Sequence, residues 1–242
     1  MLGWFYLSAV ILSLWFLLYH EFPMSVPSGQ DVLSYLEQIG TRSLLFNIGR
    51  TLLNTIAGFL ISLAAAFISI ALYYINDHAA SLIEALNTFI QSVSALVWTL
   101  IFLLIFGLTS SLPPILVVAA TSYPILLTVG LNGAKVVVEK FGDMARAMGA
   151  RRRQLIEYFI FPGVLPYLAS GSRAAIGNSL RISVVAEALG SSGGVGYMLV
   201  YCYNLGYKGG VFAWSIILIA LMILVDLAIL RQLERWFINW MS

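Results

Sequence analysis

Residues 135–166, KVVVEKFGDMARAMGARRRQLIEYFIFPGVLP, decide how this chain is organised. The stretch holds six of the 13 Lys and Arg residues of the chain, and the sequence on either side of it is almost entirely apolar. A charged, helix-forming segment between apolar runs cannot lie in hydrocarbon, because ionised side chains are costly there. By the positive-inside rule we expect this segment, the charged island, to face the cytoplasm.

Composition predicts an integral membrane protein. Of the 242 residues, 60% are hydrophobic and 10% are charged, and the mean hydropathy is +0.92. Soluble domains average about 25% charged residues. The single cysteine, Cys202, excludes an intrachain disulfide and indicates no cysteine-based metal site. We therefore expect an all-α membrane domain over residues 1–242, with no metal centre.

Apolar runs of about 20 residues are long enough to span a bilayer. A Gly-Ser-Pro-rich turn, Gly107–Pro114, divides one long uncharged run into two spans. About six transmembrane helices are expected, at residues 3–19, 51–75, 86–106, 115–133, 163–186 and 211–230. Residues 135–162 of the charged island are expected to form the cytoplasmic region between the fourth and fifth spans. The first span lacks a basic n-region, so we expect it to be retained rather than cleaved as a signal peptide. A short amphipathic helix is also predicted at residues 31–39.

The topology follows from the charged island. If the island lies inside, the fourth span enters the cytoplasm and the fifth leaves it. Counting along the chain then places both termini in the cytoplasm. The sequence thus predicts a multi-pass protein of the plasma (inner) membrane, oriented mainly by one loop.

The charged island contains its own docking pattern. Met144 and Met148 lie four residues apart and so share one helix face. Gly149 can end that helix in a left-handed conformation. We expect two short helices joined at this glycine, and their flexible methionines suit a groove on a partner protein.

The island resembles the cytoplasmic signature of permease subunits in binding-protein-dependent ATP-binding cassette importers. That signature is E-A-A, three residues, G, nine residues, and then I-x-L-P. The matching positions here are Asp143, Met144, Ala145, Gly149, Phe159, Phe161 and Pro162. The spacing is intact, and Ala145, Gly149 and Pro162 are identical to the signature. Met144 and the two phenylalanines depart from it but stay apolar.

Other stretches resemble the nitrate/sulfonate/taurine branch of these permeases, from about residue 26 to the end of the chain. VPSGQDVL at residues 26–33 and YPILLTVGLNG at 123–133 are similar to stretches of that branch. So is the series Arg173, Gly177, Arg181, Ala186, Glu187 and Gly194–Tyr197. The resemblance implies a type I importer permease fold.

The resemblance also implies partners. A separate ATP-binding cassette ATPase subunit would dock on the island, which would be its coupling helix. Two permease copies, either a homodimer or a pair of paralogues, would pair with two ATPases and receive solute from an external solute-binding protein. ATP and Mg would be bound by the ATPase. This chain has no G-x-x-x-x-G-K-[ST] motif, so it is expected neither to bind ATP nor to be an enzyme, and no nucleic-acid partner is expected. The residues implied in coupling are Asp143, Met144, Ala145, Met148, Gly149, Phe159 and Pro162.

Three residues in or near the fifth span are candidates for the translocation pathway or its gate. Arg181, an ionisable residue within a span, could attract an anion. It could instead form a structural pair with Glu187 or with another helix. Asn178 could line the pathway or hold helices together. Glu187 could take part in gating or in binding-protein docking, or be an interfacial carboxylate. For Arg151–Arg153, contact with phospholipid and contact with the ATPase both remain open.

The predicted function is that of a permease subunit working by alternating access. The branch and Arg181 favour a small anion such as a sulfonate, nitrate or bicarbonate, and the branch also admits a vitamin precursor. The alternatives are a secondary transporter or channel acting alone, and a membrane enzyme. The chain shows no convincing pair of broken helices for the former and no His/Cys/carboxylate cluster for the latter.

Overall fold

The computed structural model describes residues 10, 13, 15, 17–22, 25–149 and 151–241, and for residues 146 and 229–241 only the backbone. The predicted first span, residues 3–19, therefore lies mostly outside the described residues. Over the rest the fold is all-α, as predicted. The helices are α2 Gly29–Gln38, α3 Thr41–Tyr73, α4 Asp77–Ser92, α5 Ala95–Phe106, α6 Leu112–Ala147, α7 Arg152–Leu155, the π-helical turn η1 Ile156–Ile160, α8 Phe161–Leu189, α9 Val195–Asn204 and α10 Lys208–Met241.

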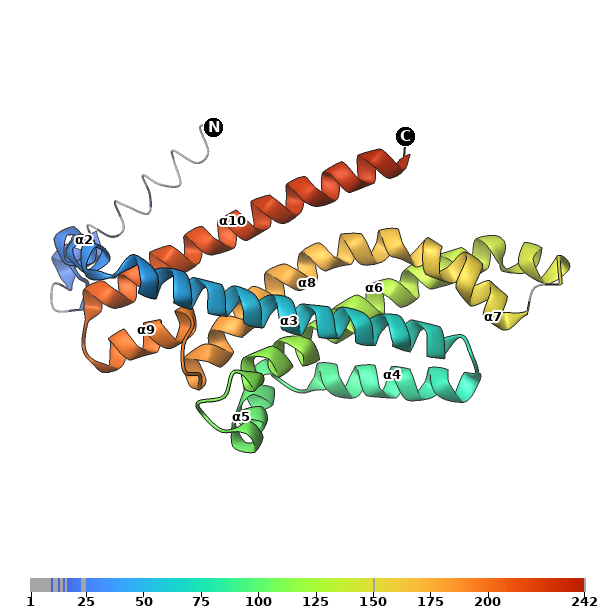
Figure 1. Ribbon diagram of the computed structural model, residues 1–242, viewed down its shortest axis with the longest axis horizontal. Helices are drawn as coiled ribbons and strands as arrows, with labels where there is room; N and C mark the ends of the chain where they lie inside the picture. The colour runs from blue at the N-terminus through green and yellow to red at the C-terminus, as the bar shows by residue number, and fades with distance from the viewer. Residues whose placement is uncertain are drawn as a thin grey trace.

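Three long helices, α3, α6 and α8, lie along one another and form the centre of the molecule (Figure 1). Their shared core buries Ile70, Leu126 and Val164 completely. Small residues allow this close packing. A Cβ atom at Gly58 would lie only 2.6 Å from the Ile115 carbonyl oxygen, and one at Gly133 would lie 2.5 Å from the Tyr167 ring. These glycines therefore set the spacing between the central helices.

Length and apolarity mark the membrane-spanning elements. Within the described residues, three helical segments are long and apolar enough to cross a bilayer, at Thr41–Tyr73, Leu112–Ala145 and Lys208–Ala228. The fifth predicted span falls within α8, which has 29 residues. α3 begins at Thr41 rather than at residue 51, because its polar first turns continue the helix instead of forming a loop.

The predicted third span, residues 86–106, is not a single helix. It divides into α4 and α5, which meet at an angle of 93°. Val93 and Ser94 have extended backbone conformations, and the Ser94 hydroxyl accepts a hydrogen bond from the Leu96 amide at the start of α5. A serine cap thus ends one helix and begins the next where the sequence has neither glycine nor proline.

The charged island also differs from two isolated short helices. α6 runs without a break from Leu112 to Ala147, so the first half of the island is the end of a membrane helix. The second half passes through α7 and η1 directly into α8. The predicted break at Gly149 is confirmed, because this residue has a φ of 77°. The predicted amphipathic helix is also confirmed, as α2.

Candidate functional site

The charged island forms a hairpin, residues 143–162, at one end of the molecule. Figure 1 shows this hairpin at the end opposite α2 and α9, beside the turn that joins α3 to α4. The Arg152 guanidinium donates a hydrogen bond to the Ile75 carbonyl oxygen over 3.0 Å, which ties the hairpin to that turn. The island therefore has a fixed place at the end of the central helices.

The predicted methionine face points outward. Met144 is 49% exposed and Met148 is 66% exposed, whereas Ala145 is only 1% exposed and packs inward. Asp143 lies on the exposed side as well. The end of α6 and the turn that follows it thus present the flexible apolar side chains of Met144 and Met148 outward, while Ala145 packs against the core. This arrangement suits docking into a groove.

The second arm of the hairpin is held by aromatic and backbone contacts. Gly149 reverses the chain, and the Arg151 amide then donates to Gln154 Oε1 over 2.8 Å where α7 begins. The half-buried Phe159 ring lies 6.3 Å from the Phe141 ring of α6. Pro162 is exposed near the start of α8. The structure thus brings the predicted coupling residues together in one hairpin.

Glu187 lies at the other end of the molecule, where α8, α3 and α9 meet. Its side chain is fully buried, so in this conformation it does not reach the surface of the molecule. Thr51 Oγ1 donates to Oε2 over 2.7 Å, and Asn54 Nδ2 donates to Oε1 over 2.8 Å. Longer contacts come from the Ser183 hydroxyl at 3.4 Å and the Gly196 amide at 3.3 Å. All these partners are donors, which suits an acceptor-only carboxylate.

This buried cluster caps the N-terminus of α9. The Gly194 amide donates to Asn47 Oδ1 and the Val195 amide donates to Thr51 Oγ1, each over 2.9 Å. The first amides of α9 therefore find their acceptors on α3 and α8. A carboxylate at a helix N-terminus also interacts favourably with the helix dipole. Glu187 thus joins α9 to the central helices.

Glycine is required at the turn that precedes α9. Gly194 has a φ of 114°, a conformation that L side chains rarely adopt. Cβ atoms at Gly194 and Gly196 would also collide with the Glu187 carboxylate and the Val184 carbonyl oxygen, respectively. The turn that contains Gly194 and Gly196 is therefore built around the Glu187 side chain.

The three pathway candidates do not form one cluster. Arg181 is exposed and lines a cavity of about 260 Å³ between α8 and α10. Arg173 lines the same cavity and pairs with Asp226 at 3.8 Å. Asn178 is half-buried. The structural pair of Arg181 with Glu187 does not form, because the carboxylate is occupied by α3 and α9.

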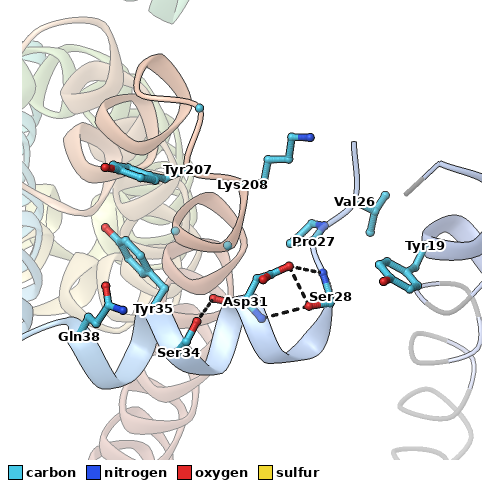
Figure 2. Close-up of a pocket in the computed structure, with 13 residues that line it drawn as sticks. Tyr19, Val26, Pro27, Ser28, Asp31, Ser34, Tyr35, Gln38, Tyr207 and Lys208 are labelled. Carbon is cyan, nitrogen blue, oxygen red and sulfur yellow. Dashed lines mark hydrogen bonds between the residues drawn. The ribbon is translucent and has the colours of Figure 1, made fainter. Parts of the chain in front are cut away.

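A polar pocket of about 460 Å³ opens where α2 meets the start of α10 (Figure 2). Both the Ser28 hydroxyl and its amide donate to Asp31, and this lowers the pKa of Asp31 below its ordinary 3.8. Burial, together with a 3.0 Å hydrogen bond to Cys202, raises the pKa of Tyr35 to about 12. Lys208 adds a cation to the same rim. This end of the molecule therefore presents fixed polar groups outside the apolar spans.

Sequence reasoning did not single out Thr51 and Asn54, which hold the Glu187 carboxylate. They lie three residues apart on α3, a spacing that places both on one face of the helix. Polar side chains repeated on one face of a membrane helix indicate a buried polar partner. That partner lies 136 positions away from Thr51.

Residues 58–238 match the family model of the binding-protein-dependent transport system inner membrane component. The chain belongs to this family. It is a multi-pass membrane protein of the permease type, and the resemblance drawn from its motifs is confirmed.

Curated relatives span most of the chain. An ABC transporter permease protein of Methanocaldococcus jannaschii is 28% identical over 97% of this chain and 90% of its own length. An aliphatic sulfonates transport permease protein of Bacillus subtilis is 27% identical over 86% of this chain and 75% of its own length. A formylaminopyrimidine transport permease protein of Halalkalibacterium halodurans is 23% identical over 90% of this chain and 86% of its own length.

Solved structures show the same fold. A chain from inward-facing conformations of the MetNI methionine ABC transporter superposes with a TM-score of 0.70, at 17% identity, over 81% of this chain and 96% of that one. An amino acid ABC transporter crystallised with histidines gives the same TM-score over 85% of this chain. The type I importer permease fold is thus established for this family member.

Proposed function

We propose that this subunit forms the translocation pathway of an ATP-driven importer and is driven through the charged island by a separate ATPase. The observation that carries this proposal is the hairpin at residues 143–162. It is tied to the helix core at Ala145 and presents Met144 and Met148 outward. Because the hairpin joins the end of α6 to the start of α8, a partner protein bound to its methionines can move both helices together.

The direction of transport follows from the two ends of the molecule. We place the hairpin in the cytoplasm by its positive charge. The polar pocket of Figure 2 then lies at the outer end, where a solute-binding protein would deliver its cargo. Both termini would be cytoplasmic. The ATPase would hold ATP and Mg, and a second permease copy would complete the pathway.

A small anion is the substrate class that we favour, with a vitamin precursor as the other candidate. Among the described residues Arg181 makes no ion pair, while Arg173, which lines the same cavity, pairs with Asp226 at 3.8 Å. An unneutralised guanidinium on α8 can attract an anion that enters between α8 and α10. The B. subtilis relative is named for aliphatic sulfonates, which are anions. The H. halodurans relative is named for formylaminopyrimidine, which supports the second candidate.

The proposed function is tested by reconstitution. The subunit, purified with its ATPase and placed in lipid vesicles, should hydrolyse ATP faster when loaded binding protein is added to the outer face. A stable, active transporter that contains no ATPase subunit would refute the proposal and favour a secondary transporter.

The role of Arg181 is tested in the same vesicles. Replacing Arg181 by Gln is expected to lower the uptake of an anionic solute about ten-fold, since the attraction for the anion is lost. Arg181→Lys should keep most of the uptake, because it retains the charge. Binding of solute by the separate binding protein should be unchanged in both. If Arg181→Gln and the unmodified protein take up the anion equally fast, Arg181 does not take part in the translocation pathway.

A further inference from the structure

A second large cavity lies at the island end of the molecule, between the end of α3 and the start of α8. Its volume is about 770 Å³. The wall is apolar and is made by Ala71, Ile75, Ile156 and Phe161. The rim is charged and carries Arg152, Arg153 and Glu157. A cavity with an apolar wall and a net positive rim matches an amphiphile with an anionic head.

The level of this cavity in the membrane is that of the lipid headgroups. α3 ends at Tyr73, and Tyr74 follows it, with the two rings 5.2 Å apart. Tyrosines at the end of a membrane helix mark the boundary between hydrocarbon and water. The second arm of the hairpin starts at the same level, because Arg152 donates a hydrogen bond to Ile75, the residue that follows these tyrosines.

Two arginines, Arg152 and Arg153, line the cavity and can meet an anion there. Among the described residues, the Arg152 guanidinium donates one hydrogen bond, to the carbonyl oxygen of Ile75, and both residues line the cavity. A guanidinium has five N–H donors, so this bond leaves others to meet a phosphate. Arg153 adds a second cation, and Glu157 offsets one of the two charges. The rim as a whole therefore remains attractive to an anion.

We propose that this cavity binds an anionic phospholipid. Arg152 and Arg153 hold the phosphate, and an acyl chain lies along Ile75, Ile156 and Phe161. Basic pockets at the cytoplasmic side of membrane helices favour such headgroups. A free phosphate would make no use of the apolar wall. The inference rests on the cytoplasmic placement of the hairpin but not on ATPase coupling.

The test is native mass spectrometry of the purified importer complex with added phosphatidylglycerol, and with phosphatidylcholine as the zwitterionic comparison. The double variant R152Q/R153Q is expected to bind phosphatidylglycerol about 30-fold more weakly, since each of the two lost cations contributes about 1 kcal/mol near a lipid surface. R151Q removes the same type of charge one residue away, outside the cavity wall. It should bind phosphatidylglycerol like the unmodified complex.

A second pair of variants tests the apolar wall without changing any charge. Ala71→Phe fills the cavity and should also lower phosphatidylglycerol binding. Leu72→Phe, on the neighbouring exposed position, should not. Inorganic phosphate at millimolar concentration should not displace phosphatidylglycerol. If it does, the cavity binds the phosphate group alone and has no site for an acyl chain, which would contradict the proposal.

Two further results would overturn the proposal. The first is equal loss of phosphatidylglycerol in R151Q and R152Q/R153Q, which would indicate general surface charge. The second is unchanged lipid binding in R152Q/R153Q with the ATPase lost from the complex in detergent. That outcome would assign these arginines to the ATPase interface. Failure of the proposed function would instead appear as absent ATPase coupling in the unmodified protein.

Discussion

Replacing Glu187 by alanine should detach α9 from the central helices and strongly destabilise the subunit. The carboxylate accepts hydrogen bonds from Thr51, Asn54, Ser183 and the Gly196 amide, all at buried positions. Each buried donor that loses its acceptor costs about 1–3 kcal/mol. We therefore expect a loss of at least about 3 kcal/mol in the free energy of unfolding, seen as a large fall in the melting temperature of the detergent-solubilised subunit.

Glu187→Gln separates the loss of hydrogen bonds from the loss of shape. The glutamine oxygen can remain on the side of Thr51 and the Gly196 amide. Its amide nitrogen then faces Asn54, whose own amide can turn to offer its oxygen. Glu187→Gln should therefore be clearly milder than Glu187→Ala. Glu37→Ala, at an exposed position of α2, is the control and should melt like the unmodified subunit.

The loss of the Glu187 carboxylate should also affect the helix that follows α9. Because α9 leads directly into α10, release of its N-terminus should free the connection between α8 and α10 at the end of the molecule opposite the hairpin. If the Glu187→Ala variant has the same melting temperature as the unmodified protein, the buried cluster does not hold α9.

Replacing Gly149 by valine should abolish substrate-stimulated ATP hydrolysis while the subunit still enters the membrane. Gly149 has a φ of 77°, and a Cβ atom added there would meet no described atom within 4 Å, so backbone strain rather than collision decides the outcome. The left-handed conformation costs an ordinary residue about 1–2 kcal/mol, and a β-branched one is an outlier there. The hairpin should therefore change shape and lose its fit to the ATPase.

The matched variants of Gly149 make this test specific. Asparagine tolerates the left-handed conformation, so Gly149→Asn should keep most of the stimulation. Gly49→Val is the control for adding a valine at an open glycine, since Gly49 lies in regular α3 with nothing within 4 Å. Normal stimulation in Gly149→Val would show that the shape of this turn is not needed for coupling.

Local patterns predicted the parts of the fold that local chemistry controls. Gly149 ends a helix because few other residues adopt its backbone angles. The apolar spacing over residues 31–39 predicted α2, which the structure begins at Gly29, after a capping pair of Ser28 and Asp31. The break at Val93–Ser94 was missed because a serine cap between apolar residues resembles an ordinary membrane helix in sequence.

The buried cluster could not be predicted, for a different reason. Glu187 lies 133 positions from Asn54 and 136 from Thr51, so only the packing of α3 against α8 brings them together. A pair of Glu187 with Arg181 was one alternative that the sequence left open, and the structure does not form it. It did not indicate that the carboxylate would be buried, because its position at the end of a span suggested an interface.

The most direct test of ATPase coupling through the hairpin is photo-crosslinking from position 148. Met148 is 66% exposed at the tip of the hairpin. A photoreactive phenylalanine analogue there should, in the purified complex, crosslink to the ATPase subunit, identified by mass spectrometry. The same analogue at Ile219, a 58% exposed position of α10, is the control and should not reach the ATPase. A complex with bound ATPase that gives no crosslink from position 148 would contradict the account.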